Sequence, residues 1–325
     1  MKVLITGITG MVGSHLADYI LSDHPGVEIH GLIRWRSPLD NIIHIQSQIA
    51  LHQAELRDLN SLITLLKKIR PDRIFHLAAQ SYVTASFDAP ADTLHTNVIG
   101  TTHLLDAVRI CDLDCKVHIC SSSEVYGQVT KDELPIRETN PFRPASPYAV
   151  SKVGEDMIAL QYFLSYGIKT VRTRMFTHTG PRRGDVFAES AFAKQIAEIE
   201  AGLRSNPMRV GNMDSVRTFA DVRDAVRAYW LLLEKCPPGE VYNIGGTRTM
   251  TIGEMLDILK GMAKCKIEHK VDPALLRPSD VTLQIPDISK FQAATDWKPE
   301  IPLEETLRDL LEYHRKRIKQ KGATL

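Results

Sequence analysis

The sequence lacks the features that would direct it to a membrane or a nucleic acid. It has no apolar run near the roughly 18 residues of a membrane-spanning helix. Its start, one lysine and then VLITG, is too short and glycine-rich for the apolar part of a signal peptide. Its 40 basic and 39 acidic side chains leave a formal charge of +1, which gives no electrostatic argument for a nucleic acid or an anionic membrane. We therefore expect a cytoplasmic protein with neither kind of partner.

Cysteine is scarce and shows no pairing. The five cysteines are odd in number and contain no CxxC spacing, so we expect reduced thiols rather than disulfides. The 12 histidines include no HExxH, and none stands with a cysteine pair at ligand spacing. No metal site is expected. The sequence also has no repeat or low-complexity tract, and its 325 residues suffice for more than one folding unit.

Short apolar segments alternate with segments of helical periodicity. Strands are predicted at 2–7, 27–34, 73–79, 116–123 and 169–176, and helices at 14–23, 59–70, 96–111 and 148–166. This alternation predicts an α/β fold with a Rossmann-type, doubly wound parallel sheet.

The second half of the chain has sparser strands and denser arginines, which predicts a smaller, interleaved C-terminal substrate domain. We place the dinucleotide-binding domain at 1–175, with 215–245 returning to it, and the substrate domain mainly at 176–325. The polar stretch 316–325 is expected to fray.

Three glycines follow the first predicted strand. Gly7, Gly10 and Gly13 are spaced GxxGxxG between that strand and a helix, which is the context of a dinucleotide-binding turn. The first glycine permits the tight turn, the second lets the backbone approach a pyrophosphate, and the third lets the helix pack closely. The helix N-terminus then offers free N–H groups to the phosphates. A tight turn without a ligand is the structural alternative.

The second strand ends in arginines where NAD-binding proteins usually carry an acid. Arg34 and Arg36 could form a fork for a 2′-phosphate, which a carboxylate would repel. This favours NADP over NAD as the cofactor. A solvated surface loop is the alternative interpretation.

A tyrosine and a lysine lie four residues apart at the start of a long predicted helix. Tyr148 and Lys152 therefore project from one face. A tyrosine with an ordinary pKa of about 10 is a poor base at neutral pH, but a nearby ammonium stabilises its phenolate. Ser122, at the end of a predicted strand, could bond the same substrate oxygen. The three residues together predict acid–base chemistry at a hydroxyl group.

These motifs resemble the extended short-chain dehydrogenase/reductase family of nucleotide-sugar enzymes. The resemblance covers nearly the whole chain, in TGITGMVG, HLAAQS (76–81), SSSEVYG, SPYAVSK, HTGPRRG (178–184) and LRPSDV (276–281). It implies a Rossmann domain for NAD(P), a smaller domain for the nucleotide sugar, and hydride chemistry by Ser122, Tyr148 and Lys152. It also implies a homodimer through helices 95–111 and 148–166, with a tetramer as the alternative.

The resemblance also assigns contacts residue by residue. The cofactor contacts that it implies are Gly7, Thr9, Gly10, Met11, Val12, Gly13, Arg34, Arg36, Leu56, Leu77, Ala78, Ala79, Gln80, Asn97, Tyr148 and Lys152, with Asn97 supporting the lysine. The nucleotide-sugar contacts are Ser81, Thr177, Arg182, Arg183, Lys194, Asn212, Arg217 and Arg277. Guanidinium groups suit a diphosphate, but a guanine base is implied by the resemblance alone. Thr177 stands where the family has asparagine, which leaves its role open.

Glu124 narrows the expected reaction within the family. Loss of water from a sugar needs an acid–base group besides the Ser–Tyr–Lys set. Ser122, Ser123 and Glu124 match the pattern of the 4,6-dehydratases, and other stretches resemble those that act on GDP-mannose. The 4-ketoreductases of GDP-6-deoxymannose also carry a Ser-Ser-Glu string, so they remain an alternative. A 4-epimerase and a non-catalytic nucleotide-binding protein are further alternatives.

Overall fold

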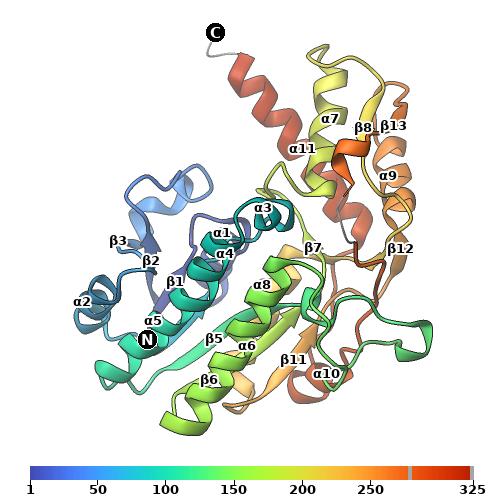
Figure 1. The fold of residues 1–325 in the computed structure, drawn as a ribbon. Helices are drawn as coiled ribbons and strands as arrows, with labels where there is room; N and C mark the ends of the chain where they lie inside the picture. The colour runs from blue at the N-terminus through green and yellow to red at the C-terminus, as the bar shows by residue number, and fades with distance from the viewer. Residues whose placement is uncertain (277–279, 323–325) are drawn as a thin grey trace.

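A seven-stranded parallel sheet forms the centre of the larger lobe in this computed structural model, which describes residues 1–276 and 280–322 (Figure 1). Its strand order is β11-β6-β5-β4-β1-β2-β3, and every neighbouring pair is parallel. This confirms the predicted doubly wound sheet. The order reverses between β1 and β4, where such sheets bind ligands at the carboxyl ends of their strands. The strands are β1 (Lys2–Thr6), β2 (Glu28–Ile33), β3 (Ala50–Gln53), β4 (Arg73–His76), β5 (Lys116–Ser122), β6 (Lys169–Met175) and β11 (Val241–Ile244).

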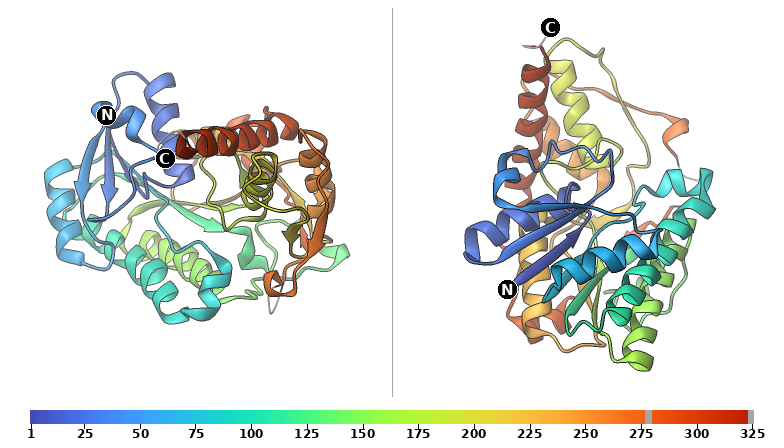
Figure 2. Two further views of the ribbon diagram at one scale, coloured as in Figure 1. Left: turned by 90° about the horizontal axis from the view of Figure 1, so that it is seen from above. Right: turned by 90° about the vertical axis from the view of Figure 1, so that its left-hand side faces the viewer.

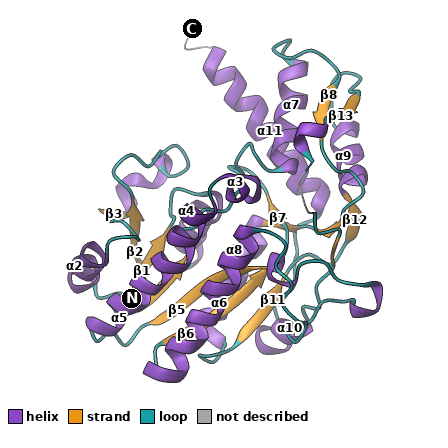
Figure 3. Ribbon diagram, in the orientation of Figure 1, coloured by secondary structure: helices purple, strands orange, loops and turns teal. Residues whose placement is uncertain are grey.

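Helices cover both faces of this sheet (Figures 1 and 3). One face packs against α1 and α8, and the other against α2, α5 and α6. The apolar sequences of the strands follow from this burial on both faces. The helices of this lobe are α1 (Met11–Asp23), α2 (Leu59–Ile69), α3 (Val83–Asp88), α4 (Pro90–Leu94), α5 (Gly100–Ile110), α6 (Pro147–Tyr166), α8 (Val222–Lys235) and α10 (Ser289–Thr295), with short helices η1 (Ile43–Gln48), η2 (His95–Ile99), η3 (Ser123–Tyr126) and η4 (Lys131–Glu133).

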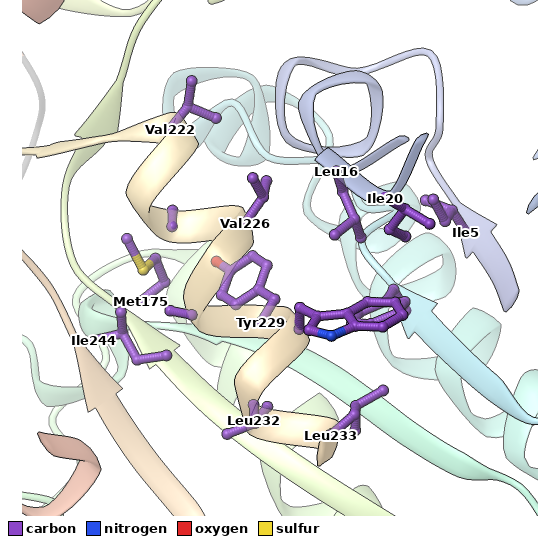
Figure 4. Packing of buried hydrophobic residues seen from close by; sticks show 14 of the residues in the cluster. Ile5, Leu16, Ile20, Met175, Val222, Val226, Tyr229, Leu232, Leu233 and Ile244 are labelled. Carbon is purple, nitrogen blue, oxygen red and sulfur yellow. The ribbon is translucent and has the colours of Figure 1, made fainter. Parts of the chain in front are cut away.

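Helix α8 fills the space between the sheet and α1. Figure 4 shows Val226 and Tyr229 of α8 directed into a cluster that includes Leu16 and Ile20 of α1. All four side chains are at most 1% exposed. The next strand, β11, pairs with β6. The segment 222–244 is therefore part of the larger lobe, although it lies between segments of the smaller one; the predicted domain boundaries stay a prediction.

The smaller lobe is built mainly on helices α7 (Ala188–Glu200), α9 (Ile252–Gly261) and α11 (Leu303–Gly322) (Figure 2). The apolar core of this lobe lies between these helices and the short strands that pack against them. The other elements are the parallel pairs β8 (Met208–Val210) with β13 (His269–Val271) and β7 (His178–Thr179) with β10 (Ala220–Asp221), the sheet of β12 (Thr249–Thr251), β9 (Val216–Thr218) and β14 (Leu283–Gln284), and the short helix η5 (Pro273–Leu275).

The C-terminal stretch differs from the prediction. Helix α11 continues to residue 322, so the expectation of fraying from 316 is wrong that far. Ile318 packs against the core of the smaller lobe, and Arg315 forms a bidentate pair with Glu200 of α7. These contacts hold a segment whose composition alone suggests a solvated tail. No helix within the described ranges is long and apolar enough to span a bilayer.

Candidate active site

A cleft of about 1190 Å³ opens at the carboxyl ends of the strands and extends to the smaller lobe. Most of the predicted site residues line it. They are Gly7, Thr9, Gly10, Met11, Val12, Gly13, Arg34, Leu56, Leu77, Ala78, Ala79, Gln80, Ser81, Ser122, Ser123, Glu124, Tyr148, Lys152, Thr177, Arg182, Arg183, Lys194, Asn212 and Arg217. Arg36 and Asn97 are not among the lining residues, and Arg277 lies outside the described residues.

The glycine turn packs closely against neighbouring backbone at the start of α1. Gly7 has a φ of +73°, and a Cβ there would lie 2.9 Å from the backbone of Ala78. A Cβ on Gly13 would lie 2.3 Å from the carbonyl oxygen of Gly7. Gly10 precedes the first residue of α1, whose free N–H groups suit a phosphate. The turn therefore fits the pyrophosphate of a dinucleotide.

The two arginines after β2 have different surroundings. Arg34 lines the cleft, and its backbone N–H donates to the hydroxyl of Ser37 at 2.9 Å. The guanidinium of Arg36 lies over the exposed ring of Trp35, 4.4 Å from its centre. Asn41, which the sequence did not single out, also lines the cleft and bonds the carbonyl of Thr9 at 2.9 Å. Only one arginine of the predicted fork faces the cleft.

Helix α6 positions the tyrosine and the lysine. Ser146 caps its N-terminus by accepting from the N–H of Ala149 at 3.0 Å, and Pro147 occupies the first turn. The ammonium of Lys152 lies 5.9 Å from the centre of the Tyr148 ring. Burial raises the pKa of Tyr148, while Lys152 and a hydrogen bond with Ser122 lower it. The two residues share a face of the helix, as predicted.

Lys152 has a partner that the sequence analysis missed. Its ammonium donates to the carboxylate of Glu155 at 2.8 Å and to the carbonyl of Cys120 at 2.9 Å. Glu155 follows Lys152 by three residues on α6, and it is 1% exposed. A spacing of three on a helix could have suggested this contact, but not its burial.

Asn97 lies beneath the cleft in the π-helical turn η2. Its side-chain oxygen accepts from the N–H of Gln80 at 2.8 Å, and its amide donates to the hydroxyl of Ser151 at 2.8 Å. Ser151 precedes Lys152 on α6. The bonds of Asn97 thus tie the loop after β4 to the helix that carries the lysine, whereas the predicted role was support of the lysine itself.

Ser122, Ser123 and Glu124 enter the cleft from the end of β5. The hydroxyl of Ser122 accepts from the N–H of Glu124 at 3.2 Å, which starts the short helix η3. The last residue of that helix, the buried Tyr126, donates to Asn243 of β11 at 2.7 Å and accepts from Arg174 of β6 at 3.0 Å. A carboxyl group is therefore held in the same cleft as the Ser–Tyr–Lys set.

The arginines of the loop after β7 diverge. Arg182 has a φ of +68° and bonds Asp18 of α1 at 2.7 Å, so its guanidinium points back to the larger lobe. The guanidinium of Arg183 lies 3.6 Å from the centre of the Phe187 ring. Burial lowers the pKa of Arg183, which also interacts electrostatically with Tyr148. Arg183 is thus the one of the two nearer to the tyrosine.

The far end of the cleft is formed by the smaller lobe. Asn212 bonds Asp280 at 2.7 Å, and Arg217 donates to the carbonyl of Val281. Lys194 of α7 pairs with Asp185 at 2.7 Å. Further cations at this end that the sequence analysis did not name are Arg204 and Arg209. Among the residues that the structure describes, no three His, Cys, Asp or Glu side chains are arranged to hold a metal ion.

A dinucleotide turn on a Rossmann-type sheet, facing a Ser–Tyr–Lys set across one cleft, defines a short-chain dehydrogenase/reductase. The family model described as GDP-mannose 4,6 dehydratase matches residues 4–310. The chain belongs to this family of nucleotide-sugar enzymes.

Curated relatives carry two activities. A GDP-mannose 4,6-dehydratase of Yersinia enterocolitica is 35% identical, over 95% of this chain and 92% of the relative. A GDP-6-deoxy-D-mannose reductase of Pseudomonas aeruginosa is 33% identical, over 98% and 99%.

Solved structures of similar fold hold either nicotinamide cofactor. The structure of RMD from Pseudomonas aeruginosa complexed with NADPH is 32% identical, with a TM-score of 0.85 over 97% of this chain and 99% of the other. The Thermus thermophilus UDP-glucose 4-epimerase complex with NAD is 27% identical, with a TM-score of 0.84 over 97% and 99%.

Proposed function

We propose that this chain is an NADP-dependent GDP-mannose 4,6-dehydratase that forms GDP-4-keto-6-deoxymannose. The observation that carries the proposal is the position of Glu124, which lines the same cleft as Ser122, Tyr148 and Lys152. Family membership and the Yersinia dehydratase support it.

The side chains divide the chemistry between two ends of the sugar. Tyr148, as the phenolate that Lys152 stabilises, takes the proton of the 4-hydroxyl, and Ser122 holds the oxygen. When bound, NADP would supply the hydride chemistry that the reaction needs at C4 and C6. The C4 ketone makes the C5 proton acidic, and Glu124 removes that proton. With Ser123, Glu124 then protonates the departing 6-hydroxyl, so that water leaves. C5 takes a new proton from solvent when C6 is reduced.

The two ends of the cleft fit the two ligands. The glycine turn and Arg34 would hold the dinucleotide, with the arginine near a 2′-phosphate. Lys194, Asn212 and Arg217 would hold the GDP part of the substrate in the smaller lobe. We infer that residues 1–175 with 215–245 form the cofactor domain, and the rest mainly the substrate domain.

The proposal includes a cytoplasmic homodimer. Exposed apolar side chains gather on the outer surfaces of η2, α5 and α6, and a second copy would cover them: Ile99, Ile110, Val150, Met157, Leu164 and Tyr166. Sedimentation of the pure protein gives its mass in solution. A monomer at micromolar concentration would contradict this part of the proposal.

The test of the reaction is mass spectrometry of the nucleotide sugar. Pure protein is incubated with GDP-mannose and a trace of NADP+, and in parallel with NAD+. Loss of one water without net accumulation of NADPH supports the dehydratase. Unchanged GDP-mannose under both conditions, from folded protein, contradicts it.

Glu124→Gln tests the step that carries the proposal. The amide keeps the shape of the side chain but cannot accept the C5 proton, so we expect turnover to fall by about 10²–10⁴-fold. Incorporation of solvent deuterium at C5 should fall with it. Glu268→Gln, which removes an exposed carboxylate that pairs with Lys266 and is not among the residues that line the cleft, is the control. Full turnover by Glu124→Gln would exclude the assigned role.

The second candidate is the NADPH-dependent 4-ketoreductase of GDP-6-deoxymannose. The reductase from Pseudomonas aeruginosa aligns with 98% of this chain at 33% identity, which is the observation that favours it. NADPH consumption with the 4-keto sugar, and no reaction with GDP-mannose, would identify the reductase. Glu124 would then be a substrate contact.

A further inference from the structure

The ammonium of Lys152 is shared between two acidic groups. Tyr148 lies one turn before it on α6, and Glu155 lies almost one turn after it. The Lys152–Glu155 contact of 2.8 Å is formed within the protein, while the ammonium stands 5.9 Å from the centre of the tyrosine ring. Both members of the ion pair have side chains at most 6% exposed, so water screens their charges weakly.

The buried carboxylate of Glu155 has a hydrogen-bond partner for only one of its two oxygens in the described structure. Its Oε2 bonds Lys152, and its Oε1 is buried without a hydrogen-bond partner in the described structure. A buried carboxylate with one satisfied oxygen is costly, and mere support of α6 would not require it. The neighbouring Asp156 differs, because both its oxygens bond arginines of β6.

We propose that Glu155 is a positioning residue that competes with Tyr148 for the ammonium of Lys152 and thereby sets the pH at which Tyr148 becomes a base. While Glu155 is ionised, it neutralises much of the charge that stabilises the phenolate. When Glu155 takes up a proton, the ammonium becomes available to Tyr148. The catalytic part of this inference rests on the proposed function, but the ionisation of Tyr148 does not.

The directions in which the pKa values of Glu155 and Tyr148 are shifted agree with this competition. Burial raises the pKa of Glu155 to about 7, against the opposing effect of Lys152. The charge of Glu155 acts on Tyr148 to raise its pKa, opposite to Lys152. The other titratable or charged groups that face this trio are His76 of β4, His118 and Cys120 of β5, Arg172 and Arg174 of β6 through Asp156, Tyr229 of α8, and Arg183 of the loop after β7.

The two histidines do not compensate for a change at Glu155. Burial lowers the pKa of both His76 and His118 to about 3, so both are neutral at the pH of the experiment. Arginine side chains in proteins do not lose their proton in the range of such an experiment. Glu155 is thus the group near Lys152 whose charge changes around neutral pH.

The test is a spectrophotometric titration of phenolate formation in the cofactor-free protein. Tyr148 is isolated as the difference between each protein and the same protein carrying Tyr148→Phe. We expect Glu155→Gln to lower the pKa of Tyr148 by about one unit. The acid limb of the kcat/KM profile should move to lower pH by the same amount. Glu155→Leu, which also removes the charge, should shift both in the same direction.

The control is Glu200→Gln, which removes a carboxylate paired with Arg315 in the smaller lobe and should leave the titration unchanged. An unshifted tyrosine in both Glu155 variants would overturn the proposal. So would an upward shift, because Glu155 would then act mainly by keeping Lys152 charged. A shifted titration with no turnover of any nucleotide sugar would keep this inference and contradict the proposed function instead.

Discussion

Replacing Asp156 by asparagine should strongly destabilise the protein. Asp156 is fully buried on α6, and its two carboxylate oxygens bond Arg172 at 2.7 Å and Arg174 at 2.8 Å. Both arginines are only 4% exposed. Asparagine keeps the shape of the side chain but removes the charge, so two guanidinium groups remain buried opposite a neutral amide.

The expected loss follows from the cost of an unpaired buried charge. Removing one partner of a buried ion pair typically costs about 3–5 kcal/mol. Other bonds of the arginines survive, because Arg172 also donates to the carbonyl of Gly239 and Arg174 to that of Glu138. We therefore expect the free energy of unfolding to fall by about 3 kcal/mol, at the lower end of this range. At roughly 2 °C per kcal/mol in a large domain, the melting temperature falls by about 6 °C.

The assay is thermal unfolding of Asp156→Asn beside Asp106→Asn. Asp106 forms an exposed pair with Arg109 on α5, and its loss should change stability by less than about 0.5 kcal/mol. Equal melting temperatures for the two variants would refute the reasoning. Activity is a second readout, because Arg174 also bonds Tyr126, which lies in the same short helix, η3, as Glu124.

Two further predictions concern the glycine turn and a buried histidine. Gly13→Ala should weaken NADPH binding at least about tenfold by calorimetry, because its Cβ would lie 2.3 Å from the oxygen of Gly7; Gly261→Ala, in open space, is the control. Burial lowers the pKa of His314 to about 4. Between pH 6.5 and 4 the unfolded chain therefore binds a proton more readily than the folded chain does. The free energy of unfolding falls as the pH is lowered through that window. Replacing His314 by glutamine should recover about 1–2 kcal/mol of the stability lost between pH 7 and 5, as melting curves measure; an equal loss in the variant and the parent would contradict this.

The pattern of apolar residues in the sequence predicted those strands that are buried on both faces of the sheet. The strands from β1 to β6, apart from β3, were all expected, and their apolar runs follow from burial on both faces. β3 was missed because it reads ALHQ, a partly buried edge strand without an apolar run. The end of helix α11, from residue 316, was expected to fray, since the apolar partners of Ile318 lie far away in the sequence.

The site was predictable where spacing fixes geometry. Tyr148 and Lys152 share a helix, and the glycines share a turn, so a local pattern suffices to place them. The arginines were less predictable. Arg182 was expected at the substrate, but its bond to Asp18 depends on a contact between residues 164 positions apart. The burial of Glu155 likewise depends on how α6 packs on the sheet, which no local pattern records.

The ion pairs under the cleft connect the two halves of the proposed chemistry. Tyr148 lies on α6, whereas Glu124 lies on η3, the short helix that follows β5. Asp156 of α6 binds Arg174, which in turn bonds Tyr126 of η3. A chain of buried, charge-assisted hydrogen bonds therefore connects the helix of Tyr148, which we propose to act at C4, with the helix of Glu124, which we propose to act at C5. An apolar replacement of this layer could pack as well, but it would lack the directional bonds that connect the two helices.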